Sequence, residues 1–150
     1  MGYLVFLCDK TGNAALISWG SKKVKRVAKS TLTAETLAAG EAADMAYMIK
    51  KATEEVLGGK LPPTKVFVDN KSLYDAAHTT NALAEKRLLV DMASLREAIE
   101  NKELILKWIP TDKQLADVLT KQGASKEKLV EVLQQGRITL KSLVKYCCVC

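Results

Sequence analysis

Long apolar runs, histidine, paired cysteines and internal repeats are all scarce in this sequence of 150 residues. The apolar stretch at residues 3–8 is too short for a signal-peptide core with its cleavage site, or for a membrane span. Cys147, Cys148 and Cys150 crowd the end of the chain and leave Cys8 as the one distant partner, so no disulfide framework is expected. We therefore expect an intracellular protein in a reducing compartment, neither secreted nor bound to a membrane.

The composition indicates one folded domain with a polyanionic partner. Apolar residues make up 48% of the chain, enough to fill a core. Lysine and arginine total 23 against 17 acidic residues, which gives a formal charge of +6. A basic surface of this size fits nucleic acid, although charge alone is weak support. The single histidine, His78, falls at the end of a predicted short helix, where a surface role is favoured over proton transfer.

Strand and helix patterns alternate along the chain, which predicts a mixed α/β domain. Alternating or continuous apolar residues predict strands at 3–8, 14–20, 66–68 and 104–109. Apolar residues spaced three and four apart, with capping residues before them, predict helices at 32–57, 70–77, 84–101, 112–121 and 126–135. Turn residues 9–13 join the first two strands into a hairpin.

Three acidic residues occupy unusual positions in this pattern. Glu35 lies early on a helix of small apolar residues, Asp69 ends the most hydrophobic strand, and Asp117 lies on a short helix after the last strand. The carboxyl ends of central strands border the crevice where ligands bind in an open α/β sheet. Carboxylates gathered there repel one another unless a cation neutralises them, and Mg²⁺ prefers such oxygen ligands. Taken singly, each also has an ordinary explanation: a helix dipole, a turn or a solvent-facing side chain.

The sequence around these acids resembles one family. Residues 30–36 (Ser-Thr-Leu-Thr-Ala-Glu-Thr) are similar to the helix start Ser-Ser-Thr-x-Ala-Glu-Tyr of copia-type retrotransposon ribonuclease H domains. Residues 68–72 (Val-Asp-Asn-Lys-Ser) resemble the family's Asp-Asn-x-Ser block. Residues 108–111 (Trp-Ile-Pro-Thr) and 114–121 (Gln-Leu-Ala-Asp-Val-Leu-Thr-Lys) resemble its closing signature. The resemblance runs in order from about residue 2 to residue 124, and the hairpin corresponds to the family's second and third strands.

This resemblance implies a fold, a reaction and a set of partners. Residues 1–124 would form a ribonuclease H-like mixed sheet flanked by helices, and residues 125–150 a C-terminal helix with a frayed tail. Glu35, Asp69 and Asp117 would be three of the family's four catalytic carboxylates and would bind Mg²⁺ or Mn²⁺. The implied activity is endonucleolytic hydrolysis of the RNA strand of an RNA:DNA hybrid during reverse transcription. The reverse-transcriptase region of the same Pol polyprotein would be a partner, in a cytoplasmic virus-like particle or the nucleus, and no small-molecule substrate is implied.

Basic and polar residues near these motifs are the candidates for binding the hybrid through its phosphates and 2′-hydroxyls. The connector at 22–29 could equally be a plain solvated loop. The nucleic-acid-binding candidates are Lys22, Lys23, Lys25, Arg26, Asn70, Ser72, Lys86 and Arg87.

The sequence departs from the family at its amino terminus. The family's first strand carries an Asp just before the Gly-Tyr hairpin, whereas this chain begins at Met1, Gly2 and Tyr3. Asp9 is no substitute, because it lies at the far turn of the hairpin. We expect an N-terminally truncated sheet with exposed backbone groups and impaired cleavage.

Two explanations of this departure stay open: the chain can be a fragment of a longer polyprotein, or a decayed or separately expressed remnant. Besides a ribonuclease H, two other functions stay open. One is a remnant that binds nucleic acid without cleaving it, and the other is an integrase-like polynucleotide transferase, against which the block at 114–121 argues.

Overall fold

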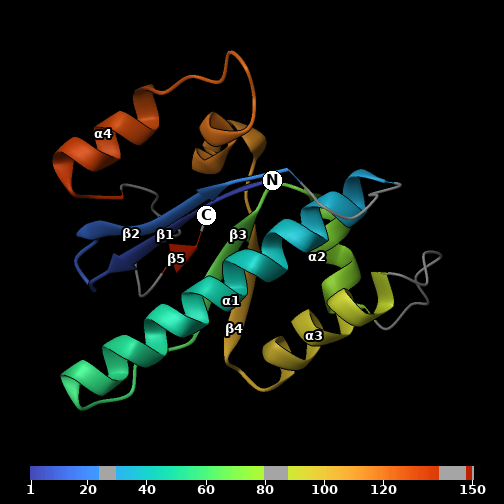
Figure 1. Cartoon of the computed structure of the whole chain (residues 1–150), viewed down its shortest axis with the longest axis horizontal. Helices are drawn as coiled ribbons and strands as arrows, with labels where there is room; N and C mark the ends of the chain where they lie inside the picture. Colours follow the sequence, from blue (N-terminus) through green and yellow to red (C-terminus); the bar gives the residue numbers. More distant parts are fainter. Residues whose placement is uncertain (24–29, 80–87, 139–147, 150) are drawn as a thin grey trace.

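The chain folds into a mixed α/β structure built on one five-stranded sheet (Figure 1). The computed structural model describes residues 1–23, 30–79, 88–138 and 148–149. The strands are β1 (Gly2–Cys8), β2 (Ala14–Ser21), β3 (Thr64–Val68), β4 (Leu104–Trp108) and β5 (Cys148–Val149). The α-helices are α1 (Thr31–Leu57), α2 (Lys71–His78), α3 (Leu88–Glu100) and α4 (Glu127–Gln135), and the 3₁₀ helices are η1 (Thr111–Lys113) and η2 (Leu115–Leu119).

The strands lie in the order β2-β1-β5-β3-β4. β1 and β2 form the predicted antiparallel hairpin, and β3 and β4 pair in parallel. Parallel pairing brings the carboxyl ends of β3 and β4 to the same edge of the sheet, so the segments that follow them start side by side. This is the edge at which Asp69 follows β3.

The hairpin turn is organised by Asp9. Its carboxylate accepts hydrogen bonds from the backbone N–H groups of Thr11 and Asn13 at 2.8 and 2.9 Å, and from both of their side chains. These bonds, led by the one from the Thr11 hydroxyl, lower the pKa of Asp9 to about 2. Asp9 is thus a turn residue, as the sequence predicted.

Helices cover both faces of the sheet, and successive β1 residues therefore enter different cores. Val5 packs in the cluster that contains the buried alanines of α1, whereas Phe6 packs with Leu115 and Leu129 of η2 and α4. Figure 1 shows α1 lying across the sheet beside α2 and α3, with α4 apart from them. The sheet is therefore buried on both faces at β1, which explains its continuous apolar sequence.

Helix α1 begins and ends where the sequence predicts. The Ser30 side chain accepts a hydrogen bond from the Thr33 N–H at 3.2 Å, and Gly58 ends the helix in the left-handed conformation with φ 66°. Its buried side carries Ala39, Ala42 and Ala46, whose small side chains let the helix pack closely on the sheet. Glu35 consequently lies in the first turns of α1.

Two residues near the end of the chain differ from the expected frayed tail. Cys148–Val149 form β5, which pairs antiparallel with Val5 and Phe6 of β1 and parallel with Lys65 and Val66 of β3. The expectation of exposed backbone groups in the truncated sheet is therefore wrong at Val5 and Phe6, which pair with β5. The two apolar strands that flank β5 create a position that an extended apolar segment can occupy.

The segment expected as one helix at 112–121 instead forms η1 and η2. Gln114 separates them in an extended conformation, with φ −77° and ψ 105°. Its side chain accepts from the Ala116 N–H and donates to the Phe67 carbonyl of β3, at 3.5 and 3.4 Å. This tie to the sheet opposes a continuous helix.

The first part of the helix expected at 84–101 lies outside the described residues, which resume at Leu88. Within the described ranges, no helix combines the length and the apolar character that crossing a membrane requires.

Candidate functional site

The three acidic residues singled out by the sequence gather at one edge of the sheet. Glu35 comes from α1, Asp69 from the end of β3, and Asp117 from η2. The Lys121 ammonium lies 2.7 Å from Asp117 Oδ2 and 3.9 Å from Asp69 Oδ2, so one side chain contacts two of the three. The charges of Asp69, Asp117 and Lys121 all act on Glu35. We call Glu35, Asp69 and Asp117 the acidic triad.

Asp69 is held by the residues on either side of the β3 terminus. The Trp108 indole N–H, at the end of the neighbouring β4, donates to the Asp69 carbonyl at 3.0 Å. Asn70 accepts from the Leu73 N–H at 3.0 Å and thereby caps α2. The Trp108 bond and the Asn70 cap consequently fix the Asp69 backbone on both sides. Neither of them uses the Asp69 carboxylate.

Asp117 is positioned by the burial of its neighbours. Leu115 and Ala116 are buried against the sheet, and Gln114 reaches the Phe67 carbonyl. The turn that follows is closed by the Asp117 carbonyl, which accepts from the backbone N–H groups of Thr120 and Lys121 at 3.0 and 2.8 Å. These contacts bring the Asp117 carboxylate and the Lys121 side chain together.

Both strands of the hairpin also contact η2 and fix its position. Gly2 packs so closely against it that a Cβ atom at this position would lie 2.8 Å from Thr120 Cγ2. The Ser21 hydroxyl of β2 donates to the Leu119 carbonyl at 2.7 Å. A side chain at position 2 would push η2, and Asp117 with it, away from the sheet.

The electrostatics of the triad favour a positive charge. Burial raises the pKa of Glu35 above its usual range, and the nearby Asp69 and Asp117 carboxylates raise it further. Lys121 and the amino terminus of Met1 act in the opposite direction. The hydrogen bond to Asp117 raises the pKa of the Lys121 ammonium, so the lysine stays protonated at neutral pH. The ionised form of Glu35 is therefore disfavoured by burial and by its acidic neighbours, and Lys121 offsets part of this effect.

The raised pKa of Glu35 predicts a pH-dependent stability. The pKa of Glu35 is higher in the folded chain than in the unfolded chain, because the folded environment disfavours the ionised carboxylate. The free energy of unfolding therefore falls as the pH rises from the Glu35 pKa of the unfolded chain through that of the folded chain. Glu35→Gln removes this penalty, so the variant should be more stable than the wild type at pH 7 in metal-free buffer. The gain should vanish below pH 4, where Glu35 is protonated in both states. Urea unfolding at the two pH values measures this difference, and an equal effect at both would contradict it.

The chemistry of the triad fits a hard divalent cation. Carboxylate oxygens from three different elements are ligands that Mg²⁺ and Mn²⁺ prefer. In the side-chain positions of the described residues, however, no three Asp, Glu, His or Cys side chains lie close enough to hold one metal ion. The Lys121 ammonium lies beside Asp69 and Asp117 instead. The donor type thus fits a divalent cation, while the spacing of the described side chains does not.

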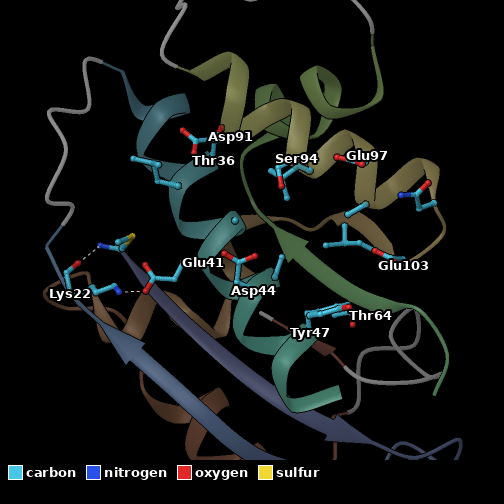
Figure 2. A pocket seen from close by; sticks show the side chains of 18 of the residues that line it. Lys22, Thr36, Glu41, Asp44, Tyr47, Thr64, Asp91, Ser94, Glu97 and Glu103 are labelled. Carbon is cyan, nitrogen blue, oxygen red and sulfur yellow. Dashed lines mark hydrogen bonds and ion pairs between the residues drawn. The ribbon is translucent and has the colours of Figure 1, made fainter. Parts of the chain in front are cut away.

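The candidates for binding nucleic acid have different surroundings. Lys25, Arg26, Lys86 and Arg87 lie outside the described residues. Asn70 and Ser72 follow Asp69 directly, and Ser72 is exposed on the first turn of α2. Lys22 forms an ion pair with Glu41 of α1 (Figure 2), so its ammonium is already engaged by a carboxylate. Lys23 lines the same cavity as this pair.

That cavity, of about 710 Å³, lies between α1 and α3. Figure 2 shows carboxylates from both helices around it. The acidic residues that line it are Glu41, Asp44, Asp91, Glu97 and Glu103. No member of the acidic triad lines it, and its many carboxylates would repel phosphate. This cavity is therefore a poor site for nucleic acid.

Sequence reasoning missed Trp108, Gln114 and Lys121 as parts of the site. The spacing of Asp117 and Lys121, four residues apart, could have signalled an ion pair. The other two act through bonds to backbone carbonyls, for which the sequence carries no signal. His78 lies on the exposed end of α2, as expected, with Nδ1 2.8 Å from the Tyr74 carbonyl.

Comparison with known proteins finds relatives among retrotransposon polyproteins. The chain is 32% identical over 123 residues to the retrovirus-related Pol polyprotein from transposon RE1 of Arabidopsis thaliana, a match covering 80% of this chain and 8% of the relative. It is 33% identical over 112 residues to the corresponding polyprotein from transposon TNT 1-94 of Nicotiana tabacum, covering 74% of this chain and 8% of that relative. The chain thus spans less than a tenth of the length of these relatives. No family model and no solved structure matches it.

Proposed function

We propose, from this similarity to retrotransposon Pol polyproteins, that the chain is their ribonuclease H domain. Its reaction would be endonucleolytic hydrolysis of the RNA strand of an RNA:DNA hybrid, with the reverse-transcriptase region of the same polyprotein supplying that hybrid inside a virus-like particle. The observation that carries the proposal is the acidic triad. Glu35, Asp69 and Asp117 come from distant parts of the chain, and each lies within a block that resembles the family's motifs.

In this proposal the triad holds Mg²⁺ or Mn²⁺ through its carboxylate oxygens. Divalent ions at such a site activate water and stabilise charge on phosphorus and on the leaving oxygen. The protein fixes where the carboxylates stand: Trp108 holds the Asp69 backbone, and Gln114 and Gly2 fix the segment of Asp117. A site built on anchored elements needs little rearrangement when substrate arrives.

Hybrid binding would use groups next to the triad. Ser72 is exposed beside Asp69 and can donate a hydrogen bond to a phosphate or a 2′-hydroxyl. The Asn70 carbonyl oxygen is engaged as a helix cap, which leaves its amide N–H groups as donors. Lys22 and Lys23 are weaker candidates, because the Lys22 ammonium is paired with Glu41 and Lys23 lines the acidic cavity.

Hybrid cleavage tests the proposal directly. The chain would be extended at its amino terminus by the segment that precedes the matching region in the RE1 polyprotein, where the family resemblance leads us to expect the Asp-bearing strand. We expect Mg²⁺-dependent cleavage of a labelled RNA strand in a hybrid, and none of the DNA strand or of duplex DNA with the same sequence. The 150-residue chain alone should cleave poorly. Absence of Mg²⁺-dependent cleavage by the extended chain would refute the nuclease proposal.

A second candidate function is binding of nucleic acid without cleavage, which the position of Lys121 favours. The Lys121 ammonium already contacts Asp69 and Asp117 and offsets part of their negative charge without a metal ion. A chain of this kind would bind hybrids with an affinity that falls steeply with salt, and the extended chain would show no turnover. Hybrid affinity that does not change between low and high salt would contradict this candidate.

A further inference from the structure

The centre of the sheet is filled by the shortest strand that the structure describes. β5 has two residues, whereas its neighbours β1 and β3 have seven and five (Figure 1). It pairs with Val5 and Phe6 on one side and with Lys65 and Val66 on the other. Cys150, the next residue, lies outside the described part of the chain. The described residues of β5 thus pair with only part of each flanking strand.

The positions beyond β5 are apolar and buried. Because β5 runs antiparallel to β1 and parallel to β3, the next positions in its direction lie beside Leu4 and Phe67, and then beside Tyr3 and Val68. All four residues are buried. Tyr3 and Val68 belong to the core cluster on one face of the sheet, and Leu4 and Phe67 to the cluster on the other. A strand that continued past β5 would contact both cores, so it would need apolar side chains at successive positions.

A side chain, and not a strand, binds the Phe67 carbonyl. The Val68 carbonyl accepts from the Ile109 N–H at 2.9 Å, on the β4 side. Successive residues of a strand direct their backbone groups to opposite edges, so those of Phe67 point toward β5. The Phe67 carbonyl accepts from Gln114 Nε2 at 3.4 Å, which is long for a hydrogen bond. A backbone N–H from a longer strand beside β3 could replace this contact.

We propose that the position between β1 and β3, which we call the central slot, binds an extended apolar strand, and that β5 is its exchangeable occupant. The incoming strand would run as β5 does, antiparallel to β1 and parallel to β3. Its carboxyl end would then lie beside Gly2, where a short hairpin can join it to β1. The direction therefore points to the segment that precedes the matched region in the longer Pol polyproteins, of which that region is only 8%.

This inference goes beyond the proposed function, because strand exchange requires neither a metal ion nor cleavage. Competition with β5 decides how tightly the central slot binds a strand. A strand that must displace β5 has its affinity lowered by the fraction of molecules in which the slot is open. Val149→Pro removes a backbone N–H from β5 and should weaken its hold. Val149→Ala keeps that N–H and is the matched control.

The probe is a synthetic peptide of about ten residues, the upper end of usual strand lengths. Its sequence is that of the RE1 polyprotein immediately before the matched region, and a scrambled peptide of the same composition is the control. We expect the wild-type chain to bind the RE1 peptide, and Val149→Pro to bind it about two- to tenfold more tightly, the effect of losing one competing hydrogen bond. Val149→Ala should gain less affinity than Val149→Pro. Fluorescence anisotropy of the labelled peptide measures the affinities, and circular dichroism checks that the variants fold.

Amide hydrogen exchange of the wild-type chain gives a second test that needs no variant. Val66 and Phe67 are adjacent and both buried, but their backbone groups point to β4 and β5 respectively. We expect the Phe67 amide to exchange faster than the Val66 amide, because local opening of β5 exposes it. Adding the RE1 peptide should slow exchange at Phe67 and leave exchange at Val66 nearly unchanged.

Several results would overturn this proposal. The RE1 peptide could fail to bind, could bind no better than the scrambled peptide, or could bind folded Val149→Pro and the wild type equally. If Val149→Pro does not fold, exchange at Phe67 that the peptide leaves unchanged would have the same force. A wild-type dimer that Val149→Pro dissociates, seen by sedimentation, would assign the central slot to a second copy of the chain instead. None of these results bears on the nuclease proposal, which the cleavage assay of the extended chain tests separately.

Discussion

Asp69→Asn in the extended chain is expected to lower Mg²⁺-dependent hybrid cleavage by roughly 10²–10³-fold, the loss typical when one group that stabilises transition-state charge is removed. The substitution replaces one carboxylate oxygen by an amide and so removes a negative charge from the triad. The asparagine side chain has the same shape as the aspartate side chain. The hydrogen bond from Trp108 goes to the backbone carbonyl of residue 69, which the variant keeps. The loss should therefore come from the chemistry of the site and not from unfolding.

The matched control is Asp75→Asn on the helix that follows. Asp75 is exposed and pairs with Lys71 four residues before it, outside the triad. The Asp75→Asn variant should cleave the hybrid at nearly the wild-type rate. Initial rates with a labelled RNA strand measure both variants, and circular dichroism checks that both fold. Equal rates for Asp69→Asn and wild type would remove Asp69 from the catalytic machinery.

Asp69→Asn should not lower the stability of the metal-free protein. Asp69 raises the pKa of Glu35, so ionised Asp69 and Glu35 repel each other in the folded chain. Removing that repulsion offsets the loss of the 3.9 Å contact with Lys121. Activity is thus expected to fall while stability is kept, which is typical of a residue placed for function.

The sequence allowed the triad to be named because each acid lies at a position that its local pattern leaves unexplained. Asp69 follows a strand that is buried on both faces, and Glu35 lies on a helix of small residues. That these residues meet could be expected from the parallel order of β3 and β4, whose carboxyl ends share one edge. What could not be expected is how the acids are held, because Trp108 and Gln114 bind backbone carbonyls that any sequence would present.

Other features were beyond sequence reasoning because they depend on distant contacts. Cys148–Val149 form a strand since β1 and β3 leave a place for one, and no local property of two residues could reveal that. Likewise, the helical pattern at 112–121 is broken by the tie between Gln114 and β3. Tertiary contacts overrode local propensity in both places. Helices α1 and α2 were predictable because Ser30 and Asn70 supply caps within the segment itself.

Phe6→Ala is expected to lower the free energy of unfolding by about 3–5 kcal/mol, the usual cost of removing a large buried aromatic side chain. Phe6 is the largest of the side chains that the described part of the chain buries completely, with 0% exposure. It packs in the core cluster that includes Leu115 of η2, so its loss leaves a cavity beneath the element that carries Asp117. A small domain has only about 5–15 kcal/mol of total stability, so this loss is a large fraction of the total.

The control for this substitution is Val56→Ala, at a position of α1 that is 85% exposed. It should change the free energy of unfolding by less than about 0.5 kcal/mol, since it creates no cavity and alanine favours helix. Urea unfolding followed by circular dichroism measures both variants. Similar stabilities for Phe6→Ala and Val56→Ala would mean that β1 is not the centre of the core. Because Phe6 supports η2, the folded fraction of the Phe6→Ala variant should also bind Mn²⁺ more weakly than the Val56→Ala variant. This result would connect the packing of the sheet to the geometry of the acidic triad.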